Sequence, residues 1–192
     1  MLGFAVVLLA LLLAALGVIV YGVSIYNGLV GVKNQVDQAW ANIDVLLRQR
    51  HDELPKLIDV VKGYGAYERD LLEKVTRLRA HTATGREPDA SRLAAEDEVS
   101  VAVSRLLVTA EAYPDLKAST AYLELQRRIG ALEEQIAHRR EYYNDAVNLN
   151  NVRTEQFPDM LLASMAGLHR APLFAATAEE KADIDVGGRL KT

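Results

Sequence analysis

The sequence predicts an all-α membrane protein, in which an N-terminal transmembrane helix continues into an elongated antiparallel helical bundle. Three observations predict this class. An uncharged apolar run opens the chain, apolar residues recur every three or four positions beyond it, and no segment alternates apolar and polar residues convincingly as a strand would. We divide the chain into residues 1–32 (transmembrane anchor and exit), 33–170 (helical bundle domain) and 171–192 (a loosely ordered C-terminal tail).

The apolar run extends from Leu2 to Tyr26, and no charged side chain precedes Lys33. At about 1.5 Å per residue, such a helix is long enough to cross a hydrocarbon core of ~30 Å. A cleavable signal peptide is the alternative, but its basic start, shorter apolar core and small-residue cleavage site are not evident. We therefore expect a retained anchor in contact with membrane lipid, with a span that includes Leu2, Leu9, Leu13, Val20 and Tyr26.

Composition excludes several classes of function. The 192 residues carry 22 Lys and Arg against 26 Asp and Glu, a formal net charge of −4. A general nucleic-acid binder normally has a basic excess, so we expect no nucleic-acid partner. Cysteine is absent, which excludes disulfides, thiolate metal sites, iron–sulfur clusters and a cysteine nucleophile.

The first helix beyond the membrane is marked by an apolar stripe. Val36, Trp40, Ile43 and Leu47 follow one another at steps of four, three and four, which is the period of one buried helix face. The same period resumes after Pro55, so we expect one helix to continue to about Thr82, with a kink or an end at the proline.

Two further long helices complete the predicted bundle. One runs from Asp89 to Tyr113 and is closed by Pro114, and the next begins near Ser119 and ends at Phe157 and Pro158. A short fourth helix could occupy residues 159–169. The residues that we assign to packing within this bundle are Tyr64, Tyr113, Pro114, Tyr143 and Phe157.

Motifs for catalysis are missing. A di-iron helical bundle needs Glu-x-x-His pairs, and none of the four histidines has a glutamate three residues before it. Glu134 and His138 form a single i,i+4 pair, for which a solvated helix face is sufficient explanation. We therefore expect a protein that is not an enzyme, with no catalytic residue, no cofactor and no metal.

A stripe of amide side chains lies along the third helix. Asn144, Asn148 and Asn151 stand at i, i+4 and i+7 and therefore share a face. Such amides either form hydrogen bonds across a helical interface and set its register, or face water. The spacing leaves both possibilities open.

The spaced residues of the chain resemble those of the LemA family of bacterial membrane proteins. The resemblance covers roughly residues 26–158. It is carried by Tyr26-Asn27-x-Leu29-Val30, Asn34-x-Val36, Ala39-Trp40-x-x-Ile43-Asp44-Val45-x-Leu47, Arg50-x-Asp52-x-x-Pro55, Val61-Lys62-Gly63-Tyr64, Ala112-Tyr113-Pro114-Asp115-Leu116-Lys117-Ala118, Leu125-Gln126, Glu133-x-x-Ile136-Ala137-x-x-Arg140-x-x-Tyr143-Asn144-x-x-Val147 and Phe157-Pro158.

The resemblance implies a membrane anchor followed by an elongated antiparallel helical domain. It implies no established enzymatic activity and no general cofactor. It also favours a bacterial cytoplasmic (inner) membrane, crossed once, with the helical domain on the extracytoplasmic side.

Helix lengths then predict an unpartnered surface. A straight helix from Lys33 to Thr82 would rise ~75 Å, whereas the helix from Asp89 to Tyr113 would return only ~37 Å. The stripe of Val36, Trp40, Ile43 and Leu47 would remain exposed near the membrane, unless the chain folds back at Pro55 or the short fourth helix covers it. We expect another subunit to cover it, with Asn144, Asn148 and Asn151 in the same interface.

These expectations lead to two hypotheses. The first is a homo-oligomer that self-assembles through its helical domain and scaffolds or remodels membrane or envelope components. The alternative is a monomeric membrane-anchored adaptor that binds another membrane protein through the same stripe or through the asparagine face.

Overall fold

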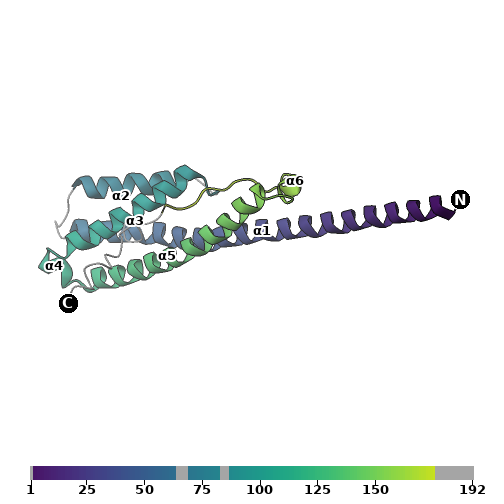
Figure 1. The fold of residues 1–192 in the computed structure, drawn as a ribbon. Coiled ribbons are helices and arrows are strands. Elements are labelled where there is room, and N and C mark those ends of the chain that lie inside the picture. The colour runs from purple at the N-terminus through teal and green to yellow at the C-terminus, as the bar shows by residue number, and fades with distance from the viewer. Residues whose placement is uncertain (1, 64–68, 83–86, 176–192) are drawn as a thin grey trace, which may run out of the picture.

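The chain forms one very long helix against which the remaining helices pack (Figure 1). The computed structural model describes residues 2–63, 69–82 and 87–175. Within them the predicted all-α class is confirmed, since they contain helices and no strands. The elements are α1 (Leu2–Gly63), α2 (Arg69–Thr82), α3 (Ala90–Ala110), α4 (Pro114–Lys117), α5 (Thr120–Glu155) and α6 (Met160–Ala163).

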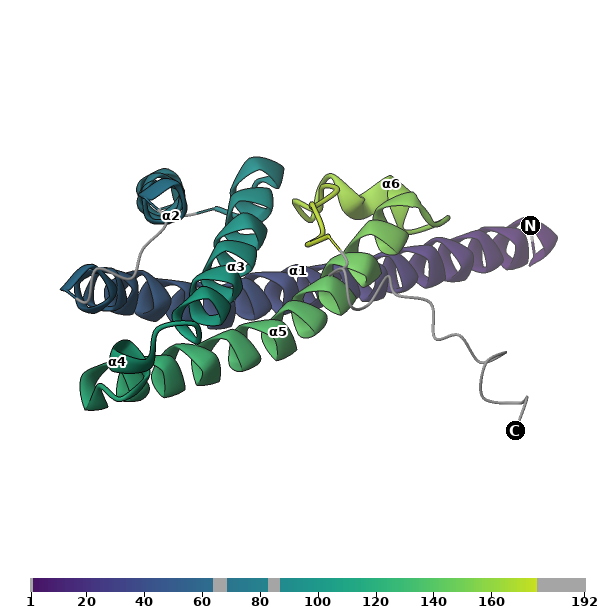
Figure 2. The ribbon, with the colours of Figure 1, turned by 90° about the vertical axis from the view of Figure 1, so that its left-hand side faces the viewer.

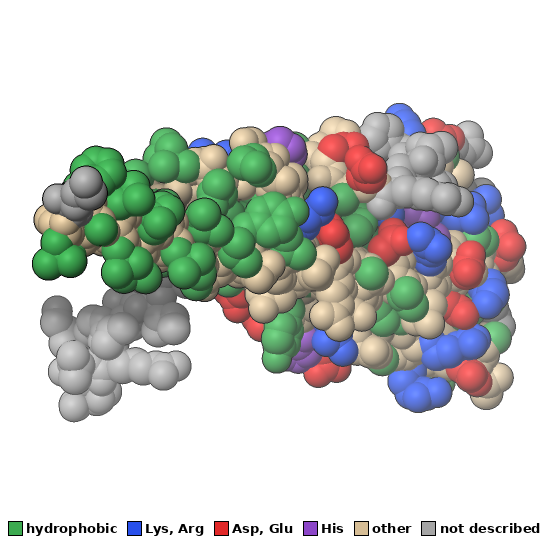
Figure 3. Space-filling model, turned by 90° about the vertical axis from the view of Figure 1, so that its right-hand side faces the viewer, with side chains coloured by type: hydrophobic (Ala, Val, Ile, Leu, Met, Phe, Trp, Pro, Cys, Tyr) green, Lys and Arg blue, Asp and Glu red, His purple; other side chains and the backbone are tan. Residues whose placement is uncertain are grey.

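The N-terminal part of α1 projects alone from the bundle. Its large apolar side chains between Leu2 and Tyr21 are 50% to 85% exposed, and nothing in the described chain packs on most of this segment. Seen from that end, its surface is almost entirely hydrophobic, whereas charges of both signs are interspersed on the bundle behind it (Figure 3). By length and composition this segment can span a membrane.

Pro55 lies inside α1 and does not end it. A proline has no N–H, so the carbonyl oxygen of His51, four residues earlier, loses its helical donor. Arg79 of α2 replaces that donor, because its Nε lies 3.0 Å from the His51 carbonyl oxygen. The helix therefore passes through the proline with its backbone hydrogen bonding compensated by a neighbouring helix.

The expected single helix from Lys33 to Thr82 is wrong. The first helix ends at Gly63, and α2 is a separate element that begins at Arg69. Glycine costs about 1 kcal/mol per residue in a helix interior, and Gly63 is the last residue of α1. The returning chain therefore starts far nearer to the membrane than a rod extending to Thr82 would allow.

The long helix α5 lies along α1 and runs in the opposite direction (Figures 1 and 2). Its 36 residues correspond to about 54 Å, which is close to the length of α1 beyond Tyr26. The two helices are still adjacent at Gly28, where a Cβ atom would stand 3.0 Å from Nη2 of Arg153. The helices α2 and α3 pack together over the distal half of α1 (Figure 2).

Three apolar clusters follow α1 from its distal end toward the anchor. The distal cluster joins α1, α2, α3, α4 and α5 around fully buried Leu54, Leu57 and Val61. The middle cluster surrounds Trp40. The third lies beside the end of the apolar run and joins α1 to α6 and the residues that follow it.

The Trp40 stripe is therefore not an exposed surface. Trp40, Ile43 and Leu47 are 8%, 0% and 1% exposed within the single chain, and Val36 is partly buried. Their cover comes from Ile136, Tyr143 and Val147 of α5, together with Leu93 and Phe174. The expectation that these four residues form a self-assembly face is wrong, because α5 returns along the half of α1 that was expected to lack a partner.

The residues assigned to bundle packing have different outcomes. Tyr143 is fully buried and Tyr113 packs against the distal cluster. Pro114 is exposed and begins α4, where a missing N–H costs nothing. The assignment of Phe157 is wrong, since its side chain is 73% exposed. Tyr64 lies outside the described residues.

Leu47→Ala should lower the free energy of unfolding by about 2–5 kcal/mol, because it opens a cavity beneath α5. Leu123→Ala is the matched control, since Leu123 is 47% exposed on α5, and should change stability by less than about 0.5 kcal/mol. Urea unfolding of the detergent-solubilised protein, followed by fluorescence of the single tryptophan, measures both. Equal losses in the two variants would contradict the burial of the stripe.

Candidate functional site

A buried guanidinium group lies at the centre of the bundle. Arg50 of α1 is 0% exposed and forms ion pairs with two carboxylates, one on each of two other helices. Its Nη2 lies 2.5 Å from Oε2 of Glu96 on α3, and its Nη1 lies 3.0 Å from Oε1 of Glu133 on α5. Ser100 accepts a third hydrogen bond at 2.6 Å and donates to Glu133 at 2.8 Å. This Arg50 network connects α1, α3 and α5.

A second ion pair extends the network toward the middle cluster. Arg92 of α3 lies 2.6 Å from the carboxylate of Asp44 on α1, and both residues are buried. The Arg92 guanidinium also lies over the Trp40 ring, 4.8 Å from its centroid, which is within the range of a cation–π interaction. On the other side of Arg50, His51 lies 2.9 Å from the Thr82 hydroxyl of α2.

The pKa values of two neighbouring carboxyls on α3, Glu96 of the network and Asp97 beside it, are shifted in opposite directions. Burial alone would raise the pKa of Glu96, but the hydrogen bond to His51 and the charge of Arg50 outweigh it and hold that pKa below its usual value. For Asp97, burial outweighs the attraction of Arg140 at 2.6 Å, so its pKa is raised. Glu96 is therefore an anion committed to an ion pair, not a poised acid or base.

Within the described residues, no group of three or more His, Cys, Asp or Glu side chains is arranged to hold a metal ion. The network combines buried carboxylates with buried guanidinium groups, and each carboxylate is engaged by a cation. Such an arrangement sets the register between helices, because slipping a helix by one turn would leave a charge buried without its partner.

The asparagine pair Asn144 and Asn151 holds a strap, which we define as residues 169–175. Asn151 Oδ1 accepts from the Ala171 N–H at 2.9 Å and its amide donates to the Ala171 carbonyl at 3.1 Å. Asn144 repeats the pattern at Phe174, with distances of 3.0 and 3.3 Å. Seven helical residues span about 10.5 Å and three extended residues about 10 Å, so the two repeats match in length.

The strap closes the middle cluster. Phe174 is 4% exposed and contacts Tyr143 edge to face, with ring centroids 5.6 Å apart. The Tyr143 hydroxyl donates to the Pro172 carbonyl at 3.1 Å, and burial raises the pKa of Tyr143 to about 12. Residues 171–175 therefore belong to the bundle and not to a loosely ordered tail, while residues 176–192 lie outside the described part of the chain.

The asparagine face is thus used within the chain. Asn144 and Asn151 bind the strap, and the neighbouring Asn150 donates to the His169 carbonyl at 2.7 Å. Asn148 is exposed beside them. The expectation that Asn144 and Asn151 serve a self-assembly interface is wrong, because their amides already pair with the backbone of the same chain.

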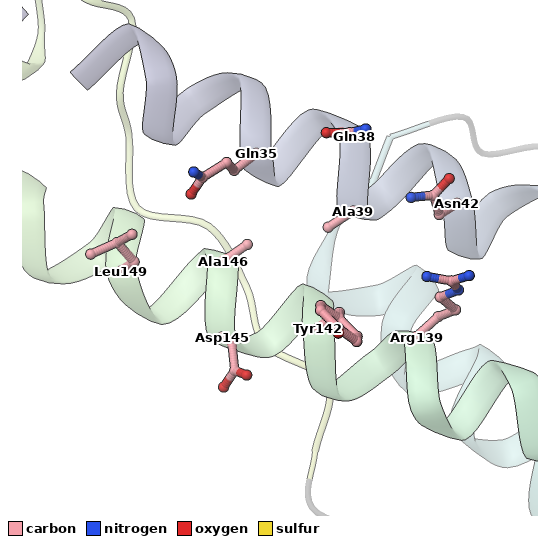
Figure 4. A pocket seen from close by; sticks show the side chains of 9 residues that line it. All are labelled: Gln35, Gln38, Ala39, Asn42, Arg139, Tyr142, Asp145, Ala146 and Leu149. Atoms are coloured by element: carbon pink, nitrogen blue, oxygen red, sulfur yellow. The ribbon is translucent and has the colours of Figure 1, made fainter. Parts of the chain in front are cut away.

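An open groove lies between α1 and α5 on another face (Figure 4). Its volume is about 450 Å³. Ala39 and Ala146 each point toward the opposite helix, and their short side chains form its floor. Polar side chains, one tyrosine and one leucine line the rest. The lining as a whole consists of Gln35, Gln38, Ala39, Asn42, Arg139, Tyr142, Asp145, Ala146 and Leu149.

The sequence contains an indication of the Arg50 network, but the apolar periodicity alone does not explain it. Arg50 stands three residues after Leu47 and four before Leu54, so it occupies an apolar position of the α1 stripe. Glu96 likewise stands three residues from both Leu93 and Val99. Opposite charges at apolar positions of two helices are the pattern expected of a buried pair.

Arg50→Met should lower the free energy of unfolding by about 3–5 kcal/mol, because it leaves buried carboxylates without their cation. The exposed Arg105 offers the matched control Arg105→Met, with a change below about 0.5 kcal/mol. The triple variant Arg50→Met, Glu96→Gln, Glu133→Gln should recover most of the loss in urea unfolding. A triple variant as unstable as Arg50→Met would mean that the arginine acts by packing and not by charge.

Acid should destabilise the fold in part through Glu96. Its folded pKa lies below the usual 4.5, so the unfolded chain takes up the proton first. The stability that the ionised Glu96 contributes is complete above the usual pKa and disappears as the pH falls through the folded pKa. Glu96→Gln should therefore make the loss of unfolding free energy between about pH 5 and pH 3 shallower.

Asp97 provides the opposite control for this experiment. Because its pKa is raised in the folded state, Asp97 stabilises the fold toward low pH, and this stability is lost as the pH rises through the folded pKa. Asp97→Asn should therefore make the loss of unfolding free energy toward acid pH steeper. Urea unfolding at several pH values, read by tryptophan fluorescence, measures both slopes. Changes of the same sign in the two variants would contradict the assignment.

Comparison with known proteins agrees with the resemblance read from the sequence. A family model described as the LemA family matches residues 39–187. Protein LemA of Metamycoplasma hominis is 26% identical over 159 residues, which cover 83% of this chain and 73% of that protein. Magnetosome proteins MamQ 1 and MamQ 2 of Paramagnetospirillum magneticum are each 32% identical over 82 residues, which cover 43% of this chain and 30% of theirs.

The family match includes the whole of α3 and α5, the strap, and the part of α1 that carries Trp40 and Arg50. The middle cluster, the Arg50 network and the asparagine pair thus all lie inside the matched region. The chain is a membrane-associated helical protein that belongs to the LemA family.

Proposed function

We propose that the protein is a non-enzymatic, single-pass membrane adaptor that holds a binding groove at a set height above the bilayer. The observation that carries the proposal is the continuity of α1 from Leu2 to Gly63. One helix forms both the anchor and the central member of the bundle, so no flexible hinge separates them. The Arg50 network then keeps α3 and α5 in register on that helix.

The groove between α1 and α5 is a surface that stays open to a partner, whereas the Trp40 stripe is buried. A floor of short side chains allows another helix to approach closely, while the amides of Gln35, Gln38 and Asn42 can bond to its polar groups. Tyr142 is 69% exposed at the groove and supplies the kind of aromatic contact that is enriched in interfaces.

The height of the groove suggests the kind of partner. Gln35 and Asn42 lie on α1 about 14 and 24 Å beyond Tyr26, counted at 1.5 Å per residue. A helix that leaves the bilayer beside α1 would pass the groove within its first few turns outside the membrane. We therefore propose that the occupant is the membrane-proximal helix of another membrane protein.

Self-assembly with a scaffolding or membrane-remodelling role is the second candidate. It now rests on the groove accepting a second copy, and on the relatives named as magnetosome proteins. For both candidates the proposed site is the bacterial cytoplasmic membrane, with the bundle on its extracytoplasmic side.

A photoreactive amino acid placed at Gln38 or Tyr142 should cross-link in native membranes to a different protein. The expected product has a mass above that of the 21.2 kDa chain by a defined amount, and is identified by mass spectrometry. Ala146→Trp, which fills the groove floor, should remove the product.

Position 108 is the control, since Val108 is 69% exposed on α3 and does not line the groove. A product at twice the chain mass, confined to the groove positions, would favour the scaffold over the adaptor. Equal labelling at the groove and at position 108, or labelling that survives Ala146→Trp, would refute the groove as a binding surface.

A further inference from the structure

A cluster of large apolar side chains is exposed at the end of the bundle nearest the anchor. Phe157 is 73% exposed, Met160 50%, Leu161 63% and Met165 70%. These residues, which we call the α6 patch, lie on and around the short helix α6. The segment Met160–Leu168 contains no charged residue.

The inner side of this segment packs on α1. Ala163, Ala166 and Leu168 are buried against Ile25, Leu29 and Val32. Toward the end of the segment, the Lys33 ammonium lies beside Gly167, 3.1 Å from where a Cβ atom would stand. The segment is therefore apolar on both sides, but only its inner side is covered by the described chain.

The position of α6 along α1 determines its depth. Ile25 belongs to the uncharged run that ends at Tyr26, and Lys33 is the first charged residue of the chain. Between them α1 rises about 12 Å. An element that covers α1 from Ile25 to Lys33 therefore lies where the hydrocarbon core gives way to the headgroups, a zone of roughly 5–8 Å on each side of a bilayer.

The residues that flank the segment suit the polar edge of this zone. Arg153 forms an ion pair with Asp159, and Arg170 pairs with Glu155 at 3.1 Å. His169 is exposed beside Arg170. Charged residues thus border the apolar segment at both ends.

We propose that the α6 patch is a second membrane contact, which inserts into the lipid interface beside the transmembrane part of α1. The inference rests on the proposed anchoring of α1, because the anchor sets the level of α6. The occupant of the patch is lipid and not protein, since α1 delivers the patch to the bilayer without any further partner. A single helix can rotate about its own axis, whereas a helix with a second contact at its side presents one defined face to the membrane.

The absence of native cysteine allows this to be tested in the full-length protein with single nitroxide labels. Labels at Leu161 and Met165 are compared with labels at Leu13 in the span and Val108 in the bundle. The protein is reconstituted in vesicles of phosphatidylethanolamine and phosphatidylglycerol, and collision rates with oxygen and with a water-soluble nickel complex are measured by electron paramagnetic resonance. All four side chains are exposed, so the substitutions spare the core.

The expected result is a ratio of oxygen to nickel collisions several-fold higher at Leu161 and Met165 than at Val108, approaching that at Leu13. If the collision ratio at Leu13 is that of a lipid-exposed label while the ratios at Leu161 and Met165 equal that at Val108, the anchor is supported and the second contact is refuted. If Leu13 itself is water-like, the proposed anchoring fails first. Spin–spin broadening at Met165 that disappears on dilution with unlabelled protein would identify a second copy in place of lipid, and would also refute the proposal.

Discussion

The arrangement of the helices depends on one buried cation. Arg50 has no exposure, so its charge is compatible with the core only while Glu96 and Glu133 stay within hydrogen-bonding distance. Those two carboxylates come from different helices, and α1 carries the arginine. Hydrophobic clusters on either side supply the burial, but apolar contacts tolerate sliding. The ion pairs oppose sliding, because a helix that slips by one turn carries Arg50 or a carboxylate away from its partner.

The anchor, the long helices and the apolar faces could be predicted from the sequence, because charge and periodicity are local properties. The end of α1 at Gly63 could not, since the apolar period continues in the sequence beyond this residue. Because the chain returns from this point, α5 covers Trp40, which a longer first helix would leave exposed. Whether an apolar stripe faces its own chain or another depends on where the chain turns back, which is not a local property.

The polar residues were harder to interpret than the apolar ones. Arg50 and Glu96 stand in apolar register, yet pairing two such residues requires knowing which helices are neighbours. Asn144 and Asn151 share a face, and the i, i+7 spacing matched a polar interface, but their partner is an extended backbone and not a side chain. Amides that pair with a backbone leave no complementary residue pattern in the sequence.

Because α1 is unbroken, a tilt of its membrane-spanning part also moves its distal end. The part beyond Tyr26 extends about 55 Å, so each ~10° change in the tilt of the span displaces the distal end by roughly 10 Å. The apolar run is longer than an average hydrocarbon core, and such a span accommodates a thinner bilayer by leaning. A membrane-anchored α1 would therefore convert a change in local bilayer thickness into lateral movement of the distal helices, far from the lipids themselves.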